Sequence, residues 1–122
     1  MRERLSRALR LALTLASRDR VVLCNCPPDH AARIAQAVIE ERLAACVNVL
    51  PAVESFYEWE GRVERDAEST LLIKTTAAGV PALTARIVAL HPYELPEVIA
   101  LPVLDGEGHG PYLAWLRARV RV

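Results

Sequence analysis

The chain has 122 residues, of which 52% are hydrophobic, and its 15 basic residues balance its 15 acidic residues to a formal net charge of zero. This length favours one domain with a single core, and the balanced charge gives no indication of nucleic-acid binding. No apolar run reaches the roughly 18 to 20 residues that a membrane span requires. Three cysteines without a secretory leader indicate reduced thiols in a cytoplasmic protein.

Residues 1–19 are predicted to form a basic amphipathic helix or arm that precedes a domain over residues 20–122. Residues 1–20 hold six arginines against Glu3 and Asp19. An arm packed on the domain and translation from an upstream start are favoured over a targeting or membrane-surface segment, because the acids and the missing cleavage pattern argue against targeting. The apolar positions at helical spacing are Leu5, Leu9, Leu13 and Ala16.

The first strand and helix of the domain are predicted over residues 21–26 and 29–42. The short apolar run that begins at Val21 ends at Pro27 and Pro28, which is typical of a buried strand. Asp29 then offers an N-cap, and apolar residues follow at steps of three and four as far as Arg42.

A long hairpin is predicted next, with arms over residues 46–58 and 62–76 and a turn at Glu60-Gly61. Pro51 cannot donate to a strand ladder and predicts a bulge or an edge. Arms this long exceed the mean strand of about five to six residues, so we expect them to serve a neighbouring subunit. Alternation places on one face Val53, Ser55, Tyr57 and Trp59, and on the other Glu54, Phe56, Glu58 and Glu60.

Three more elements follow the hairpin. A helix over residues 80–90 ends at His91-Pro92, since the residue before proline resists helical backbone angles. Residues 97–103 are predicted to form a strand and residues 105–110 a glycine-rich loop, after which Pro111 opens a last helix.

The predicted order β-α-β-β-α-β-α indicates an α+β fold, a ferredoxin-like βαββαβ sandwich with a C-terminal helix and an extra N-terminal helix. In this arrangement the helices cover one face of the sheet and leave the other uncovered. Large apolar faces are not left to water, so we expect an oligomer in which the hairpin arms extend across the subunit boundary.

Few side chains suggest chemistry by pattern alone. Cys24 and Cys26 lie side by side on one strand rather than converging on a metal, and they and Cys46 are more typical of a core. His91 at a helix end is either a capping residue or a metal ligand. Lys74 is the single lysine beside fourteen arginines, and it either meets an anionic group in a confined site or extends from a strand end to water.

Three separated blocks carry a family resemblance: LAACVNVLPAVESFYEWEGRVERDAESTLLIKTT at residues 43–76, HPYELPE at residues 91–97 and YLAW at residues 112–115. In this order the blocks resemble the CutA family of divalent-cation-tolerance proteins, over roughly residues 21–120. The resemblance implies the ferredoxin-like fold, a homotrimer and a role in divalent-cation tolerance, with copper or another divalent cation as the expected ligand. It implies no catalytic activity, in keeping with the absence of phosphate-loop, nucleophile-elbow and zinc-protease motifs.

The resemblance also implies a candidate copper site. Family members that bind copper are thought to use a cysteine that ends the first strand and a histidine pair before Pro-Tyr, which correspond here to Cys24 and His91. Leu90 stands in place of the first histidine. A third donor, such as Cys26, water or a partner subunit, is therefore needed.

The second candidate site is the cleft between subunits that a trimer creates. An aromatic wall with one lysine and two carboxylates suits a small anionic or zwitterionic effector, although such residues also serve as interface packing and surface ion pairs. This site favours the alternative function, a signalling module like the PII proteins. Its residues are Tyr57, Trp59, Glu68, Lys74, Tyr93, Glu97 and Trp115.

Overall fold

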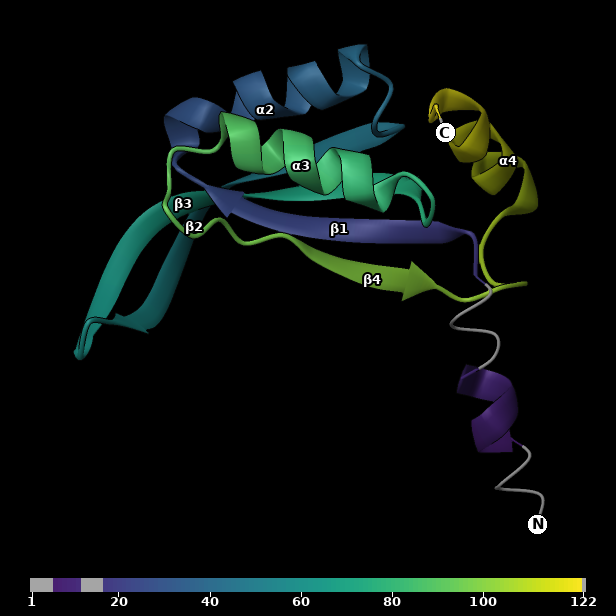
Figure 1. Cartoon of the computed structure of the whole chain (residues 1–122), viewed down its shortest axis with the longest axis horizontal. Coiled ribbons are helices and arrows are strands. Elements are labelled where there is room, and N and C mark those ends of the chain that lie inside the picture. The colour runs from purple at the N-terminus through teal and green to yellow at the C-terminus, as the bar shows by residue number, and fades with distance from the viewer. Residues whose placement is uncertain (1–5, 12–16, 122) are drawn as a thin grey trace.

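The computed structural model describes residues 6–11 and 17–121, and its elements follow the predicted order (Figure 1). Residues 6–11 are helical, residues 17 and 18 are not, and residue 19 already belongs to the first strand. The other residues of the predicted N-terminal helix or arm lie outside the described part of the chain. The domain consists of β1 (Asp19–Cys26), α2 (Pro28–Glu40), β2 (Cys46–Trp59), β3 (Arg62–Thr76), α3 (Val80–Leu90), β4 (Ile99–Val103) and α4 (Gly110–Arg119).

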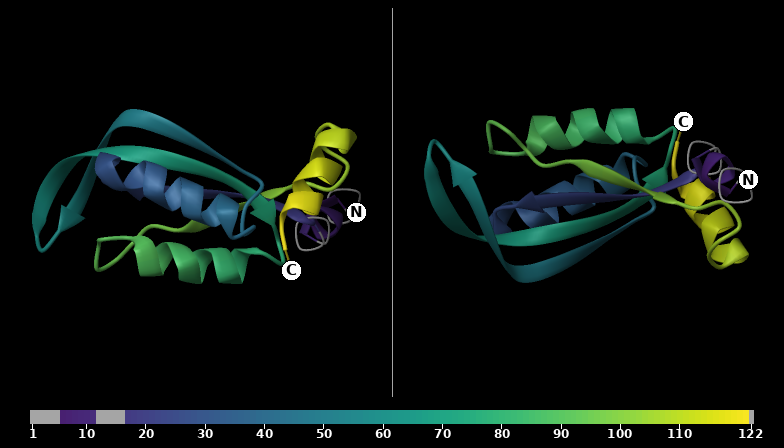
Figure 2. Two further views of the ribbon diagram at one scale, coloured as in Figure 1. Left: turned by 90° about the horizontal axis from the view of Figure 1, so that it is seen from above. Right: turned by 90° about the horizontal axis from the view of Figure 1, so that it is seen from below.

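The strands form one antiparallel sheet in the order β2-β3-β1-β4. Helices α2 and α3 lie over the same face of this sheet, and α4 lies at its end (Figures 1 and 2). The arrangement is the ferredoxin-like fold that the element order predicts. The strand β1 is paired on both edges, whereas β2 and β4 are the edge strands.

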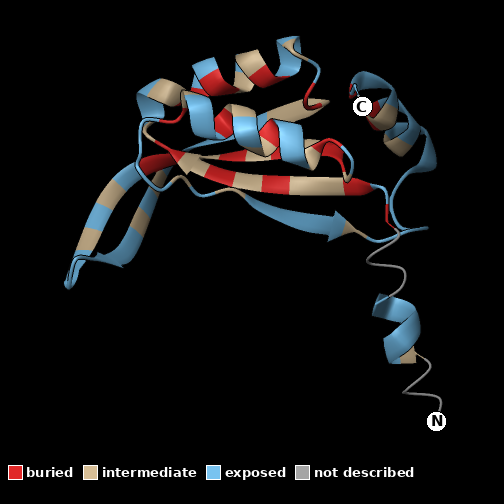
Figure 3. Cartoon of the chain, in the orientation of Figure 1, coloured by how far each residue is buried: buried red, intermediate tan, exposed pale blue. Residues whose placement is uncertain are grey.

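The core lies between the sheet and the two helices (Figure 3). Strand alternation explains its composition, because every second residue of β1 and β3 points to the helices. Cys24 and Cys26 are fully buried in it, as the apolar run predicts. The other main members are Val22, Leu71 and Ile73 from the sheet and Ile34, Val38, Leu83 and Ile87 from the helices.

The face opposite the helices is apolar and has no helix over it in the described domain. Val21 and Leu23 of β1 pair with Leu101 and Ile99 of β4, so all four side chains share this face. Ile99 and Leu101 are 50% and 46% exposed. The prediction of an uncovered sheet face is therefore confirmed.

The hairpin has the turn and the bulge that its sequence predicts. Trp59 pairs with Arg62, and Glu60 and Gly61 between them both have positive φ, 52° and 79°, as a two-residue type I′ turn requires. The register shifts between Leu50 and Val53, around the proline that cannot donate to the ladder. Pairing resumes beyond the bulge, so the long arms remain one ladder.

Several predicted boundaries were wrong by one or two residues, among them the end of the first helix, which is at Glu40 rather than residue 42. The first helix begins at Pro28 after Pro27 as N-cap, because proline at the first helical position loses no hydrogen bond. Asp29 is therefore inside the first turn rather than the cap. The strand β1 begins at Asp19 instead of residue 21, and β4 begins at Ile99 instead of residue 97, because the pairing of Leu23 with Ile99 is the last of the β1–β4 ladder.

A buried ion pair ties α4 to the sheet. The guanidinium of Arg117 donates to both carboxylate oxygens of Asp19, at 3.0 and 2.7 Å. Asp19 is only 2% exposed, so its carboxylate depends on this bidentate contact. At the end of the same helix, the backbone carbonyls of Ala118 and Arg119 accept hydrogen bonds from the Arg42 side chain at 2.9 and 3.2 Å.

We expect Arg117→Ala to lower the free energy of unfolding by about 3 kcal/mol, because it leaves the Asp19 carboxylate buried without its partner. The matched control is Arg65→Ala, which breaks the exposed pair of Arg65 with Glu54 and should cost less than about 1 kcal/mol. Urea unfolding at one fixed protein concentration measures both values. Equal losses of unfolding free energy in the two variants would contradict the claim that the Arg117–Asp19 pair stabilises the fold more than an exposed pair does.

Candidate ligand-binding site

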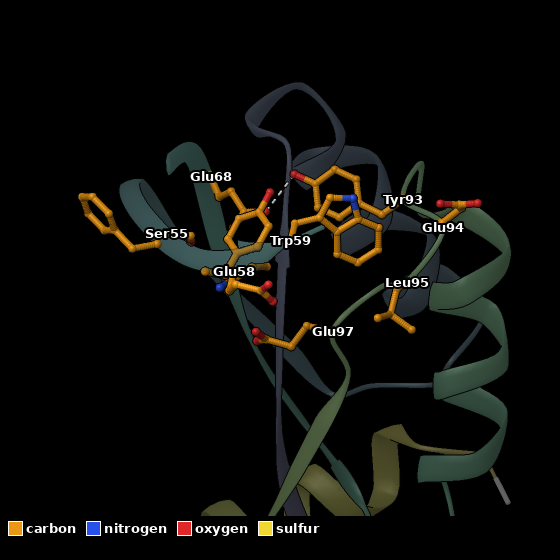
Figure 4. A pocket seen from close by; sticks show the side chains of 11 residues that line it. Ser55, Glu58, Trp59, Glu68, Tyr93, Glu94, Leu95 and Glu97 are labelled. Atoms are coloured by element: carbon orange, nitrogen blue, oxygen red, sulfur yellow. Dashed lines mark hydrogen bonds between the residues drawn. The ribbon is translucent and has the colours of Figure 1, made fainter. Parts of the chain in front are cut away.

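The hairpin and the segment that follows α3 enclose a cavity of about 650 Å³ (Figure 4). Its size is within the range of small-molecule sites. Five of the seven residues predicted for a cleft line it. The lining residues are Asn25, Ser55, Phe56, Tyr57, Glu58, Trp59, Glu68, Tyr93, Glu94, Leu95 and Glu97.

Strand register and a proline bring these residues together. Glu68 pairs with Val53 across the hairpin, so it shares a face with Tyr57 and Trp59 farther along β2. His91 ends α3 with an extended ψ of 138°, as expected before a proline, and the chain then passes beneath the sheet toward β4. This path places Tyr93 and Glu97 opposite the hairpin.

Glu68 is the most buried acid of the cavity, with 5% of its surface exposed. The Tyr93 hydroxyl donates to its Oε2 at 2.8 Å (Figure 4). Its other oxygen, Oε1, accepts no hydrogen bond from the described residues. Every buried side-chain oxygen and nitrogen among these residues has a partner, so Oε1 is not a buried atom. Oε1 therefore lies open to the cavity that Glu68 lines.

The acids and phenols of the cavity perturb one another. Burial raises the pKa of Tyr93, and its hydrogen bond to Glu68 raises that pKa further. Partial desolvation at the cavity also raises the pKa of Glu97, although its side chain is largely exposed, with the charge of Glu68 as the second cause. On the hairpin, the hydrogen bond to Asp66 raises the pKa of Tyr57 to about 12. Both phenols therefore stay protonated at neutral pH and act as donors to carboxylates.

The other two residues predicted for the cleft lie elsewhere in the chain. The ammonium of Lys74 donates to the Asn48 side chain and lies 3.9 Å from the Cys46 sulfur. Trp115 is on α4, where its ring lies 5.6 Å from that of Tyr112. A cleft that unites all seven residues would need more than one subunit, and it stays a prediction.

The sequence prediction missed six lining residues. Nothing in the sequence near Asn25 indicated that it lines the cavity. Its position follows from the pairing of β1 with β3, which sets Asn25 opposite Thr70, two residues from Glu68. The other five lie within the matching blocks, where their nearness in sequence to Tyr57 and Tyr93 was the available signal. These five are Ser55, Phe56, Glu58, Glu94 and Leu95.

Cys24 and His91 meet at one backbone carbonyl but do not form a ready metal site. His91 Nε2 lies 2.8 Å from the Asn25 carbonyl oxygen, and the Tyr93 N–H donates to Nδ1 at 3.2 Å, so both ring nitrogens are occupied. The Cys24 sulfur lies 3.7 Å from the carbonyl oxygen of Asn25 as well. Burial, followed by the charges of Cys26, Glu97 and Glu68, raises the pKa of Cys24 to about 12.

These donors do not fit copper as they stand, since metal ligation requires a thiolate and a free imidazole nitrogen. Leu90 packs against the core, and no group of three or more His, Cys, Asp or Glu residues in the described chain is arranged to hold a metal. The copper set stays a prediction that this geometry disfavours.

The CutA1 divalent ion tolerance protein family model matches residues 20–119. The chain belongs to the CutA family. The divalent-cation tolerance protein CutA of Thermus thermophilus is 51% identical over 100 residues, which cover 81% of this chain and 95% of that relative. The human protein CutA is 53% identical over 94 residues, or 76% of this chain, but the match spans only 51% of the human protein.

Solved structures of CutA proteins share the fold. The divalent cation tolerance protein from Thermus thermophilus has a TM-score of 0.81 at 48% identity and covers 84% of this chain and 99% of its own. A CutA protein from Nostoc sp. PCC 7120, described as PII-like, has a TM-score of 0.80 at 39% identity and covers 84% of this chain and 97% of its own. The fold is therefore that of CutA proteins.

The compartment differs among CutA relatives. The Arabidopsis thaliana relative is named chloroplastic, and the Archaeoglobus fulgidus structure is described as a periplasmic protein. None of the helices described here is long and apolar enough to cross a membrane. Cytoplasmic localisation stays a prediction.

The raised pKa of Cys24 predicts a protected thiol. At pH 8 we expect iodoacetamide to modify Cys46, which is half-buried, much faster than Cys24, which is fully buried. Below pH 9.0, the ordinary pKa of the thiol, the Cys24 thiol is protonated in both the folded and the unfolded chain. As the pH rises from 9.0 toward 12, only the unfolded thiol ionises freely, so we expect the free energy of unfolding to fall. Peptide mass spectrometry measures the modification, and equal rates in the folded protein would overturn this prediction.

Copper titration tests the sequence-predicted metal set. We expect calorimetry of the reduced protein with either copper valence to show no saturable site that depends on Cys24 and His91. The raised pKa of the Cys24 thiol opposes the ionisation that ligation requires, and both imidazole nitrogens have hydrogen-bond partners. The comparison is the double variant Cys24→Ser, His91→Ala. Binding of one copper per chain that disappears in the double variant would instead establish the copper site.

Proposed function

We propose that this CutA protein is a homotrimeric, non-catalytic module that binds a small effector in the cavity beneath the hairpin, and that this binding serves divalent-cation tolerance. The observation that carries the proposal is the cavity itself, where a nearly buried carboxylate keeps one oxygen open to the space. A polar group held in such a place favours ligand recognition over packing.

The uncovered sheet face supports the oligomer. Apolar residues of β1 and β4 share this face, and both edge strands, β2 and β4, have free ladder positions. Val49 and Leu50 on one edge and Ile99 and Leu101 on the other are 41–50% exposed. Joining different edges of successive copies gives a head-to-tail contact, and such contacts form a closed ring when the rotation between copies closes.

The cavity lining supports binding rather than catalysis. It contains no histidine, cysteine or lysine. Ser55 provides the one aliphatic hydroxyl of the lining, and no imidazole in the lining could activate it as a nucleophile. The PII-like description of the Nostoc relative supports an effector-binding role. Metal binding through Cys24 and His91 is the alternative, and the copper titration above separates the two.

Thermal unfolding with a panel of small metabolites and divalent cations tests the effector site. A ligand at about a hundred times its Kd adds about 2.7 kcal/mol of stability, which we expect as a rise of several degrees in Tm. Trp59→Ala should abolish the rise. Trp115→Ala is the matched control, because the two indoles are 41% and 43% exposed and only Trp59 lines the cavity.

The result also distinguishes a cavity within one chain from a cleft between chains. Loss of the response in both tryptophan variants would place Trp115 of a neighbouring copy in the site, whereas an unchanged response in Trp59→Ala would reject the site. Sedimentation equilibrium of the unliganded protein should give the mass of three chains, and a monomer at micromolar concentration would reject the trimer.

A further inference from the structure

The cavity carries negative charge that the chain does not neutralise. Four glutamates line it, and none of the lining residues is basic. The ion pairs among the described residues involve Asp19, Asp29, Glu41 and Glu54, and none of these lines the cavity. The expected anionic or zwitterionic effector therefore does not suit this site, because the lysine on which that expectation depended lies elsewhere.

The acids are also held close enough to oppose one another. Glu68 is nearly buried, and its charge contributes to the raised pKa of Glu97. Glu58 on the hairpin accepts a hydrogen bond from the Gly61 N–H at 2.9 Å, which orients its side chain without supplying a full positive charge. Gathering carboxylates in a partly desolvated space costs free energy that a bound cation offsets.

Aromatic rings form the rest of the recognition surface. Trp59 and Tyr93 line the cavity together with Glu58, Glu68 and Glu97, and in the view of Figure 4 both rings lie to one side of these three carboxylates. The faces of tryptophan and tyrosine attract cations. These rings also provide apolar surface for the carbon skeleton of a ligand.

A bare metal ion does not suit this arrangement. Hard divalent cations need several oxygen ligands that converge within about 2 to 2.6 Å of one point. The described residues contain no such group of three or more carboxylate, imidazole or thiol side chains, and the cavity of about 650 Å³ is far larger than an ion. Dispersed carboxylates around aromatic walls instead match an extended molecule with positive ends.

On the basis that the cavity is the effector site proposed above, we infer that it binds a small organic ammonium ion. The N–H groups of the ligand donate to the open oxygen of Glu68 and to Glu97, and its alkyl chain lies against Trp59 and Tyr93. Hydrogen bonds between an ammonium and a carboxylate are among the strong ones in proteins.

Calorimetric titration with three four-carbon probes tests the charge preference. The probes are 1,4-diaminobutane, 1,4-butanediol and succinate, which share a chain length and differ in charge. We expect the diamine to bind once per chain and more than about tenfold tighter than the other two, and to weaken as added salt screens the carboxylates.

Two isosteric variants and a control locate the binding. Glu68→Gln and Glu97→Gln should each weaken the diamine by about tenfold, because each removes one charge-assisted contact. Glu54→Gln is the control, since Glu54 is on the hairpin but outside the cavity, and it should leave binding unchanged. Circular dichroism checks folding, and the exposed Glu97 keeps the test valid if the buried Glu68 does not tolerate glutamine.

The outcomes separate this inference from the proposed function. Tighter binding of succinate or of butanediol, lost in Trp59→Ala, would overturn the preference for cations and leave the cavity an effector site. No binding of any probe would overturn the inference. Diamine binding that Glu54→Gln weakens as much as Glu97→Gln would also overturn it, because the attraction would then be a general surface effect.

Discussion

The sheet has helices on only one of its faces, and the rest of the structure depends on this asymmetry. The helix side is closed by Ile34, Val38, Leu83 and Ile87 and forms an ordinary core. The other side is covered in part by the segment after α3, which lines the cavity together with the hairpin. Where this segment ends, apolar residues of β1 and β4 remain uncovered, so the same constraint underlies both the proposed ligand site and the proposed oligomer surface.

The hydrogen bond between Tyr93 and Glu68 connects the two walls of the cavity. It joins the segment after α3 to the hairpin at 2.8 Å and holds a nearly buried carboxylate in one orientation. The phenol donates to only one of the two Glu68 oxygens. The hydrogen bond therefore orients the carboxylate but does not neutralise its negative charge. The Tyr93 N–H also donates to the His91 ring in the same segment, so the residue that the family resemblance implies as a metal ligand is engaged in hydrogen bonds of this segment.

Much of the fold could be predicted from local patterns. The Glu60-Gly61 turn, the bulge at Pro51 and the helix end at His91-Pro92 follow from backbone preferences of glycine and proline, and the structure has all three. Cys24 and Cys26 were predicted as core residues from their apolar run. The same reasoning placed Tyr57 and Trp59 on one face of the hairpin, because alternation along a strand depends on sequence position alone.

The sequence by itself determined the element order, the faces of the strands and membership of the CutA family, since each depends on residue spacing or on matching blocks. Only the tertiary structure decided which polar residues meet. Glu68 and Lys74 are six residues apart on one strand, yet Glu68 lines the cavity and Lys74 contacts Asn48. The reason is that β3 extends about 3.3 Å per residue, so residues that share a face can still lie in different environments, and these environments are set by the elements that cross each end of the strand.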